Sequence, residues 1–339
     1  MGEGQESAAA PAVDALAAAL RRGERRALAR AVTLVESTRP DHRAAAEALI
    51  DAILPATGGA TRLGISGPPG AGKSTFIERF GLEGIAQGRH IAVLAVDPGS
   101  KRGGGAILGD KTRMAELARA PAAFIRPSSA GTETGGVARH TREAILVCEA
   151  AGFDTVLVET VGAGQAETSV ADLVDMFLLI LPPAAGDELQ GIKRGIVELA
   201  DLILVNKADG ELLDHARRAA AEYSNALRLI RPALAEWRPA VHAVSALTGD
   251  GIAAVWDEVA RFRTALEAGS AWTRRRAAQA RAALWAEIGD ALLTRFRAAP
   301  AVAVRLAALE REVGAGARTP AAAARLLLAA FLGEAGPGG

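Results

Sequence analysis

Seven short and almost continuously apolar runs recur through the middle of the chain, and text with helical spacing separates most of them. These runs predict strands over residues 63–66, 90–96, 123–126, 155–159, 176–181, 202–205 and 240–244. Strands that are apolar on both faces are typical of a parallel sheet that helices cover on both sides. The pattern therefore predicts an α/β fold built on a mostly parallel sheet.

Sequence with helical spacing lies before and after this region of alternating strands and helices. It predicts N-terminal helices over residues 13–22, 24–37 and 41–53, after a disordered N-terminus at residues 1–10. It predicts C-terminal helices over residues 252–268, 271–298 and 301–313, and a last helix that ends at residue 332. Thr319 followed by Pro320 is typical of a helix start, because threonine caps the first turn and proline fits its first position.

This organisation predicts three parts after the disordered N-terminus. They are an N-terminal helical extension over residues 11–57, a sheet domain over 58–265 and a C-terminal helical arm over 266–335. The long helix at 271–298 carries a row of large apolar side chains at Trp272, Leu284, Trp285, Ile288, Leu292 and Phe296. Such a row either packs within its own domain or forms a subunit interface, and we favour the interface.

Composition limits the classes of partner. The 339 residues carry no net charge and only 4% aromatic residues, so neither nucleic acid nor a membrane is an expected partner. Cys148 is the only cysteine, which excludes an internal disulfide, and it lies in an expected helix over residues 137–151 as a buried thiol. No apolar run reaches membrane-spanning length and the N-terminus lacks a signal-peptide layout, so we expect a cytoplasmic protein.

The first candidate site follows the first expected strand. Residues 67–74 read Gly-Pro-Pro-Gly-Ala-Gly-Lys-Ser, which matches the phosphate-loop pattern G-x-x-x-x-G-K-[ST] between a strand and a helix. Backbone N–H groups in such a loop bind a polyphosphate, and the helix N-terminus adds partial positive charge. We expect Lys73 to reach the β- and γ-phosphates and Ser74 to ligate Mg²⁺. The expected nucleotide-binding residues here are Gly67, Pro68, Pro69, Gly70, Ala71, Gly72, Lys73, Ser74 and Thr75.

A second motif indicates which base is bound. Residues 206–209 read Asn-Lys-Ala-Asp and directly follow the strand expected over 202–205. The Asp209 carboxylate can accept from both N1–H and the 2-amino group of guanine, a donor pair that adenine lacks, and the stem of Lys207 can lie along the base. Ser245, Ala246 and Leu247 end the next expected strand and fit a second loop around the base. With Asn206, these residues predict a guanine nucleotide.

Carboxylates at other strand ends predict the metal and switch groups. Asp97 and Glu159 each end an expected strand, and Glu159 begins Glu-Thr-Val-Gly, with Gly162 placed to approach the γ-phosphate. Asp110 follows a glycine-rich stretch and is a candidate switch carboxylate. Asp97 and Asp110 could instead be ordinary cap or turn residues. Lys73, Asp110, Glu159 and Gly162 are thus the expected catalytic residues, and Ser74, Asp97, Asp110 and Glu159 the expected Mg²⁺ ligands or sensors.

The water-positioning residue is not evident. Many GTPases place a glutamine directly after the glycine that corresponds to Gly162, and here that position is Ala163, with Gln165 the nearest glutamine. We therefore expect slow intrinsic hydrolysis that a partner completes.

These motifs resemble those of the MeaB/ArgK-type GTPases of the SIMIBI class, which include the mitochondrial relative that supports methylmalonyl-CoA mutase. The resemblance covers nearly the whole chain and runs through residues 67–75, 96–100, 107–114, 126–128, 135–137, 158–165, 186–193 and 206–209. It implies a P-loop GTPase domain, Mg²⁺ at the four residues named above and a third switch at 186–193. Residues 101–105, Lys-Arg-Gly-Gly-Gly, and 182–185, Pro-Pro-Ala-Ala, depart from the usual family pattern, which leaves the behaviour of the switches open.

The resemblance also implies partners. It implies a homodimer joined through the C-terminal helices, and a client that is an adenosylcobalamin-dependent acyl-CoA mutase, methylmalonyl-, isobutyryl- and ethylmalonyl-CoA mutase all staying open. The GTPase would gate loading of the cofactor and protect or reactivate the mutase. The alternatives are a nickel-insertion GTPase, a kinase or ATPase linked to basic amino-acid transport, and a binding scaffold with an inactive site. Scattered histidines disfavour the first, the 206–209 loop disfavours the second, and Lys73, Ser74 and Glu159 disfavour the third.

Overall fold

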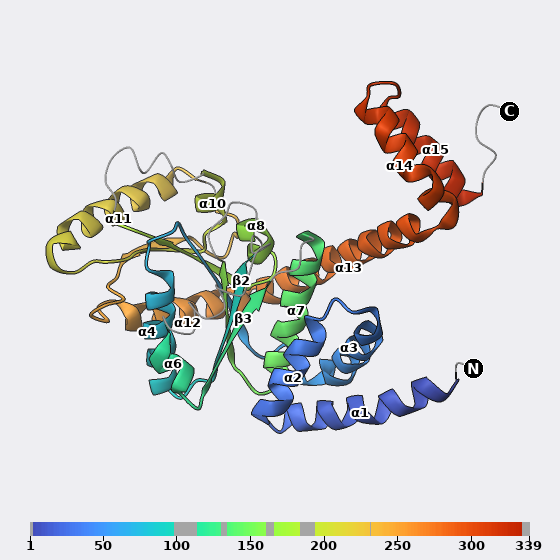
Figure 1. Cartoon of the computed structure of the whole chain (residues 1–339). Coiled ribbons are helices and arrows are strands. Elements are labelled where there is room, and N and C mark those ends of the chain that lie inside the picture. The colour runs from blue at the N-terminus through green and yellow to red at the C-terminus, as the bar shows by residue number, and fades with distance from the viewer. Residues whose placement is uncertain are drawn as a thin grey trace. The chain divides into compact units, whose positions relative to one another are not determined.

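A seven-stranded parallel sheet spans residues 61–243 of the computed structural model (Figure 1). The structure describes residues 3–97, 114–129, 134–160, 166–183, 194–230 and 232–333, and of these it leaves the side chains of 3–11, 40, 97, 127–129, 134–137, 166–167 and 194 undescribed. The strand order is β3-β2-β4-β1-β5-β6-β7 and every neighbouring pair is parallel. The strands are β1 (Thr61–Ser66), β2 (Ile91–Asp97), β3 (Ala123–Ser129), β4 (Thr155–Thr160), β5 (Met176–Leu181), β6 (Leu202–Val205) and β7 (Ala240–Ala243).

Helices fill most of the remaining described chain. Those before β5 are α1 (Glu3–Arg21), α2 (Arg25–Val35), α3 (Pro40–Ile53), the 3₁₀ turn η1 (Leu54–Ala56), α4 (Lys73–Ala86), α6 (Ala115–Arg119), α7 (Thr134–Ala150) and α8 (Ala166–Ala171). Those after β5 are α10 (Arg194–Leu199), η2 (Gly210–Leu212), α11 (Leu213–Arg228), α12 (Ile252–Ala268), α13 (Ala271–Ala298), α14 (Pro300–Gly314) and α15 (Pro320–Leu332). The α/β fold with a parallel sheet and helical ends is confirmed, and each of the seven predicted strands is present.

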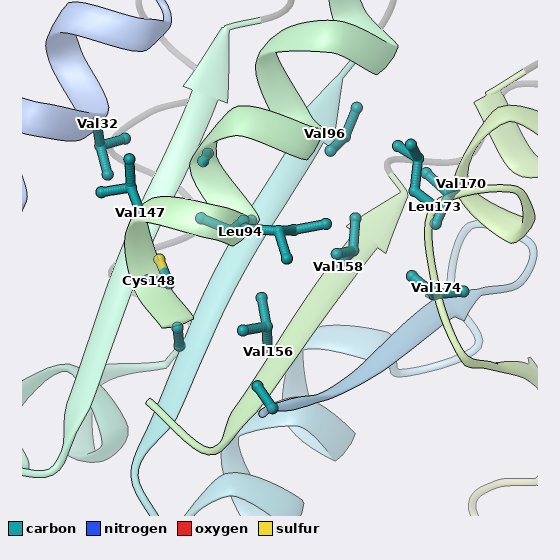
Figure 2. Packing of buried hydrophobic residues seen from close by; sticks show 14 of the residues in the cluster. Val32, Leu94, Val96, Val147, Cys148, Val156, Val158, Val170, Leu173 and Val174 are labelled. Atoms are coloured by element: carbon teal, nitrogen blue, oxygen red, sulfur yellow. The ribbon is translucent and has the colours of Figure 1, made fainter. Parts of the chain in front are cut away.

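Two hydrophobic clusters cover the two faces of the sheet. One joins α1, α2, α3, α7, α8 and α11 to the sheet, and Figure 2 shows Val32 of α2 beside Val147 of α7, with Leu94 and Val156 on the neighbouring strands. The other joins α4, α6 and α12 to the opposite face, where Phe80 stacks on Trp256 with ring centroids 4.0 Å apart. Cys148 lies in the first cluster, and burial raises the pKa of its thiol, as expected of an unreactive cysteine.

The N-terminal helices belong to this first cluster. Leu20, Val32 and Leu49, one from each helix, are fully buried in it. Helix α1 begins at Glu3, within the segment that the sequence analysis assigned to a disordered N-terminus. The run Ala8–Ala10 has high helix propensity and extends the helix backwards, which the low hydrophobicity of the first residues concealed.

The chain forms two compact units, Met1–Gln279 and Ala280–Gly339. The second unit therefore begins at Ala280, later than the arm predicted from residue 266. The start of α13 is held in the first unit, because Arg276 pairs with Asp175 at 2.7 Å and Arg275 with Asp201 at 3.1 Å. Both carboxylates are at most 7% exposed. Burial raises the pKa of Asp201, and the facing Arg275 opposes that rise.

The second unit has a small core of its own. Val302 and Leu309 of α14 pack with Ala323 and Leu327 of α15. Thr319 accepts a hydrogen bond from the N–H of Ala322 and precedes Pro320 at the first turn, which confirms the predicted helix start. None of the helices in the described part of the chain has the length and apolar character to cross a bilayer.

The apolar row predicted along α13 is divided. Trp272 packs against the core of the first unit, and Phe296 packs against Phe331 in the second with centroids 5.4 Å apart. The middle of the row is exposed: Leu284 by 58%, Trp285 by 71%, Ile288 by 37% and Leu292 by 55%.

Candidate functional site

Three described loops and the end of β4 lie at the carboxyl edge of the sheet. Strand β1 leads into residues 67–74, β6 into Asn206 and β7 into Ser245, and Glu159 is the penultimate residue of β4. Strand β1 lies between β4 and β5, so the phosphate-loop sequence sits at the centre of this edge. Loops beyond the carboxyl ends of parallel strands are the usual place for a ligand in such sheets.

The backbone of the phosphate-loop sequence requires glycine at two positions. At Gly67, φ is 150°, and an added Cβ would lie 1.9 Å from the carbonyl oxygen of Ile180. At Gly72, φ is 87°, and an added Cβ would lie 2.5 Å from Nδ2 of Asn206. Helix α4 starts directly afterwards at Lys73, so its N-terminal N–H groups face the loop. This is the cradle that a polyphosphate needs.

The two polar side chains at the end of the loop are held by hydrogen bonds. Nζ of Lys73 donates to the carbonyl oxygens of Gly67 at 2.8 Å and Pro68 at 3.3 Å, which holds the ammonium over the loop. Oγ of Ser74 donates to Oε1 of Glu159 at 3.2 Å. Glu159 is only 3% exposed. A hydroxyl and a carboxylate are hard oxygen ligands, so the pair fits Mg²⁺.

Not every predicted metal or switch residue can be placed. Asp97 ends β2 as predicted, but its side chain lies outside the described part of the structure. Asp110, Gly162 and the predicted switch segments at 101–105 and 186–193 also lie outside the described residues. The structure therefore brings together Lys73, Ser74 and Glu159 of this set.

Asn206 joins the phosphate loop to the base-loop residues. Its side chain is 2% exposed, and its Nδ2 donates to the carbonyl oxygen of Ala71 at 2.9 Å. Its Oδ1 accepts from the N–H of Ala246 at 3.0 Å. One buried amide thus uses both ends to link segments that are 135 and 40 residues away in the chain. The sequence carries no signal for this bridge, because no local pattern indicates a contact at that separation.

Asp209 is held by the second loop. Oγ of Ser245 donates to Oδ2 of Asp209, and the same hydroxyl accepts from the N–H of Thr248 at 3.1 Å. Lys207 has a φ of 62°, an uncommon value for a residue with a side chain. Such backbone strain is costly and is concentrated at functional sites. Leu247 is 73% exposed at the tip of the loop.

Two further residues shape this loop. Oγ1 of Thr248 donates to Oδ2 of Asp250 at 2.7 Å, and the carbonyl oxygen of Asp250 accepts from the N–H of Ser245 at 2.9 Å. Neither residue was predicted to be functional. The residues Thr-Gly-Asp-Gly at 248–251 are the signal that could have identified them, since threonine, aspartate and glycine favour turns in which a side chain bonds the backbone.

Known proteins are similar to this one over most of the chain. The sequence model of the family described as "Methylmalonyl Co-A mutase-associated GTPase MeaB" matches residues 28–301. The chain is 52% identical to the GTPase ArgK of Escherichia coli over 74% of this chain and 75% of that protein. It is 48% identical to the mitochondrial methylmalonic aciduria type A homolog of Mus musculus over 94% of this chain and 79% of that protein.

A solved structure carries the same fold. The crystal structure titled "LAO/AO transport system kinase" superposes with a TM-score of 0.75 at 39% identity, covering 94% of this chain and 97% of that one. The P-loop GTPase-type sheet expected from the sequence is thereby confirmed, and guanine nucleotide binding follows at the family level. The protein belongs to the MeaB family of methylmalonyl-CoA mutase-associated GTPases.

Proposed function

We propose that this protein binds and hydrolyses GTP in order to control the loading of adenosylcobalamin into an acyl-CoA mutase, and to protect or reactivate that mutase. The observation that carries the nucleotide part is the arrangement around Asn206, whose amide bonds both the phosphate loop and the loop that holds Asp209. This amide fixes the spacing of the two loops, and a fixed spacing lowers the ordering cost of binding one nucleotide across both. Membership of the MeaB family supports the mutase part.

The described residues form two groups, one for the phosphates of GTP and one for its base. Gly67–Thr75 would bind the phosphates, with Lys73 extending to the β- and γ-phosphates once it leaves its carbonyl partners. Asn206, Lys207, Asp209 and Ser245–Leu247 would enclose the base, with the Asp209 carboxylate accepting from N1–H and the 2-amino group of guanine. Adenine offers no such donor pair, which makes this arrangement unsuitable for a kinase or ATPase.

Mg²⁺ would be held by Ser74 and Glu159, whose oxygens already face one another, together with Asp97 and Asp110. When bound, the ion would neutralise charge that develops on the phosphate oxygens. Glu159 is the penultimate residue of β4, which neighbours β1, and Oγ1 of Thr160 donates to Oγ of Ser66 at 2.8 Å. A change at the metal would therefore reach the end of β1 directly.

Hydrolysis would be slow in the isolated protein. Residues 163 and 165, alanine and glutamine, occupy the segment where a water-orienting glutamine is usual, and the segment lies outside the described residues. A partner that supplies or positions a catalytic group can raise the rate by several orders of magnitude. The mutase is the partner that the family name suggests.

The assembly we propose is a homodimer that uses the exposed apolar row of α13. Leu284, Trp285, Ile288 and Leu292 expose apolar surface on one side of the helix, and large aromatic residues of this kind dominate the energy of protein interfaces. A second copy of the chain would cover them. The predicted cytoplasmic location belongs to the same proposal and rests on the sequence alone.

The decisive experiment measures client binding and turnover together. Purified full-length protein is incubated with immobilised methylmalonyl-, isobutyryl- or ethylmalonyl-CoA mutase, with and without adenosylcobalamin, and GTP hydrolysis is followed in each mixture. One mutase should bind in a nucleotide-dependent way and raise turnover by about tenfold or more. The Lys73→Ala variant is the control and should lose both nucleotide binding and stimulation. If none of the mutases binds or stimulates, the chaperone role is wrong even where GTP binding is intact.

A further inference from the structure

The two edges of the sheet differ in how they are covered. At β3, the guanidinium of Arg25 in α2 donates to the carbonyl oxygen of Ala123, and Arg126 pairs with Glu36 at 2.6 Å. Arg25 of α2 thus binds the backbone of this edge strand, and Glu36, directly after α2, binds one of its side chains. At the other edge, β7 pairs only with β6 among the described residues.

The outer side of β7 carries backbone groups that can pair with another strand. The N–H of Val244, just after β7, donates to the carbonyl oxygen of Val205 and so faces β6. Hydrogen-bonding directions alternate along a parallel strand, so Val241 and Ala243 direct their N–H groups away from β6. Among the described residues β7 pairs only with β6 and these two N–H groups have no backbone acceptor, while Gly251 lies close to the carbonyl oxygen of Ala243. An edge of this kind is a template for an added strand.

A groove of about 590 Å³ runs beside this edge. One wall comes from the segment before β7, with Trp237 and Arg238, and the other from α12, with Glu258, Arg261 and Thr264. Ala240 of β7 lines the same groove. Alternate side chains of an extended peptide point to the same face, so a peptide lying along β7 would place every second side chain toward the groove.

Glu258 gives this groove a chemical preference. Its side chain is 7% exposed, and its Oε1 lies 3.0 Å from Nε2 of His242 and 2.8 Å from Nη1 of Arg261. Its Oε2 is buried and accepts no hydrogen bond from the described residues. A buried carboxylate oxygen without a donor is unfavourable, and a cationic donor is the group that best relieves it. The side chain of Arg261 is 70% exposed, so it can turn into solvent and admit another cation at little cost.

We infer that the outer edge of β7 is a docking surface for an extended segment of a partner protein, which adds as a strand beside Val241 and Ala243 and places a lysine or arginine side chain at Glu258. Affinity comes from the backbone groups of β7, and selectivity from the buried carboxylate. Because β7 leads within two residues to Ser245, which holds Asp209, such a partner would bind next to the base-binding loop. This docking surface is the same whichever mutase is the client.

The test uses the full-length protein and two fluorescein-labelled peptides, acetyl-Thr-Val-Lys-Val-Thr-amide and the same peptide with glutamate in place of lysine. Anisotropy titration should show the lysine peptide binding about tenfold more tightly than the glutamate peptide. Hydrogen exchange with saturating lysine peptide should show new protection at the amides of Val241 and Ala243. Equal affinity for the two peptides, or protection absent from these amides, would overturn the inference.

Two variants test the roles of the buried carboxylate and of the outward backbone N–H groups separately. Glu258→Gln should bring the affinities for the two peptides within about twofold of each other, whereas Glu267→Gln, on the same helix but outside the groove, should keep the preference. Val241→Pro removes an outward N–H from an edge strand, a position that tolerates proline, and should abolish binding of both peptides while GTP binding persists. A lysine preference that survives Glu258→Gln would contradict the role of the carboxylate. Protection that grows with protein concentration alone would identify a second copy as the occupant, and would also overturn the inference.

Discussion

The two units of the chain bury apolar surface to very different extents. In Met1–Gln279, the strands β4, β5 and β6 are buried at every position, and aromatic residues of α4 and α12 stack beneath the sheet. In Ala280–Gly339, the buried core described by the structure consists of four residues, Val302, Leu309, Ala323 and Leu327. Much of the apolar surface of the second unit is exposed instead, including Trp285 at 71% and Val304 at 83%.

This difference indicates that the two units have different roles. The first unit buries its apolar side chains in its own core, and it contains all the described residues that we assign to nucleotide binding. The second unit has too little interior for its apolar content, since helices with broad apolar exposure need another surface. We therefore interpret the first unit as the self-sufficient nucleotide-binding part, and the second as a part whose stability and role depend on association.

The largest expected effect comes from the core of the first unit. Phe80 is fully buried and stacks on Trp256, so Phe80→Ala should lower the free energy of unfolding of that unit by about 3–5 kcal/mol, from lost burial and a new cavity. The matched change in the second unit is Phe331→Ala, where the ring is only partly buried and should contribute less. Urea unfolding followed by circular dichroism compares the two. An equal cost in both variants would remove the contrast between the units.

The next prediction concerns recognition of the guanine base by Asp209, a residue of the first unit. Asp209→Asn removes an acceptor that guanine uses twice and hypoxanthine once, so affinity for GTP should fall by about a hundredfold and that for ITP by much less. Isothermal titration with both nucleotides measures the difference. Asp214→Asn is the control, because Asp214 is 81% exposed on α11 and should leave both affinities unchanged. If GTP and ITP weaken equally, the base is recognised elsewhere.

The third prediction concerns the exposed apolar row in the second unit. If a second copy covers α13, Trp285→Glu places a charge in an apolar interface. The dimer dissociation constant should then rise by about thirtyfold. Thr294→Glu is the matched control, because helical spacing places that exposed residue on the other side of α13. Sedimentation velocity measures association, and GTP titration should show no change. Unaltered association in Trp285→Glu would mean that the exposed row is not the interface.

The sequence predicts the strands and motifs of the first unit better than it predicts the contacts between distant segments. Apolar runs identified all seven strands, because a strand buried on both faces leaves a local signal. The phosphate loop and the 206–209 motif are also local, since each lies within one turn. The contact of Asn206 with Ala71 is not local, and neither is the pairing of Arg275 and Arg276 with Asp201 and Asp175.

Such distant contacts leave no local signal in the sequence. Helical spacing alone placed the start of the arm at residue 266, because nothing in α13 distinguishes an arginine that faces solvent from one that pairs with a buried aspartate. The N-terminal helices were expected as an extension, and the structure places Val32 of α2 against Val147 of α7 in the main core (Figure 2). An amphipathic pattern shows that a face is buried and does not show against which partner.

The smallest expected effect concerns a single helix cap in the second unit. Oγ1 of Thr319 accepts from the N–H of Ala322 at 3.3 Å, so Thr319→Ala should cost about 1 kcal/mol and speed the exchange of the first α15 amides about fivefold. The same substitution at Thr264, inside α12 of the first unit, removes a hydroxyl that bonds only the carbonyl of Ala260, and alanine is the better helix former there. Exchange from α12 should therefore stay constant or slow. If Thr319→Ala left the α15 amides unchanged, contacts from another surface would be holding that helix start, and the second unit would depend on its partner even more than its small core suggests.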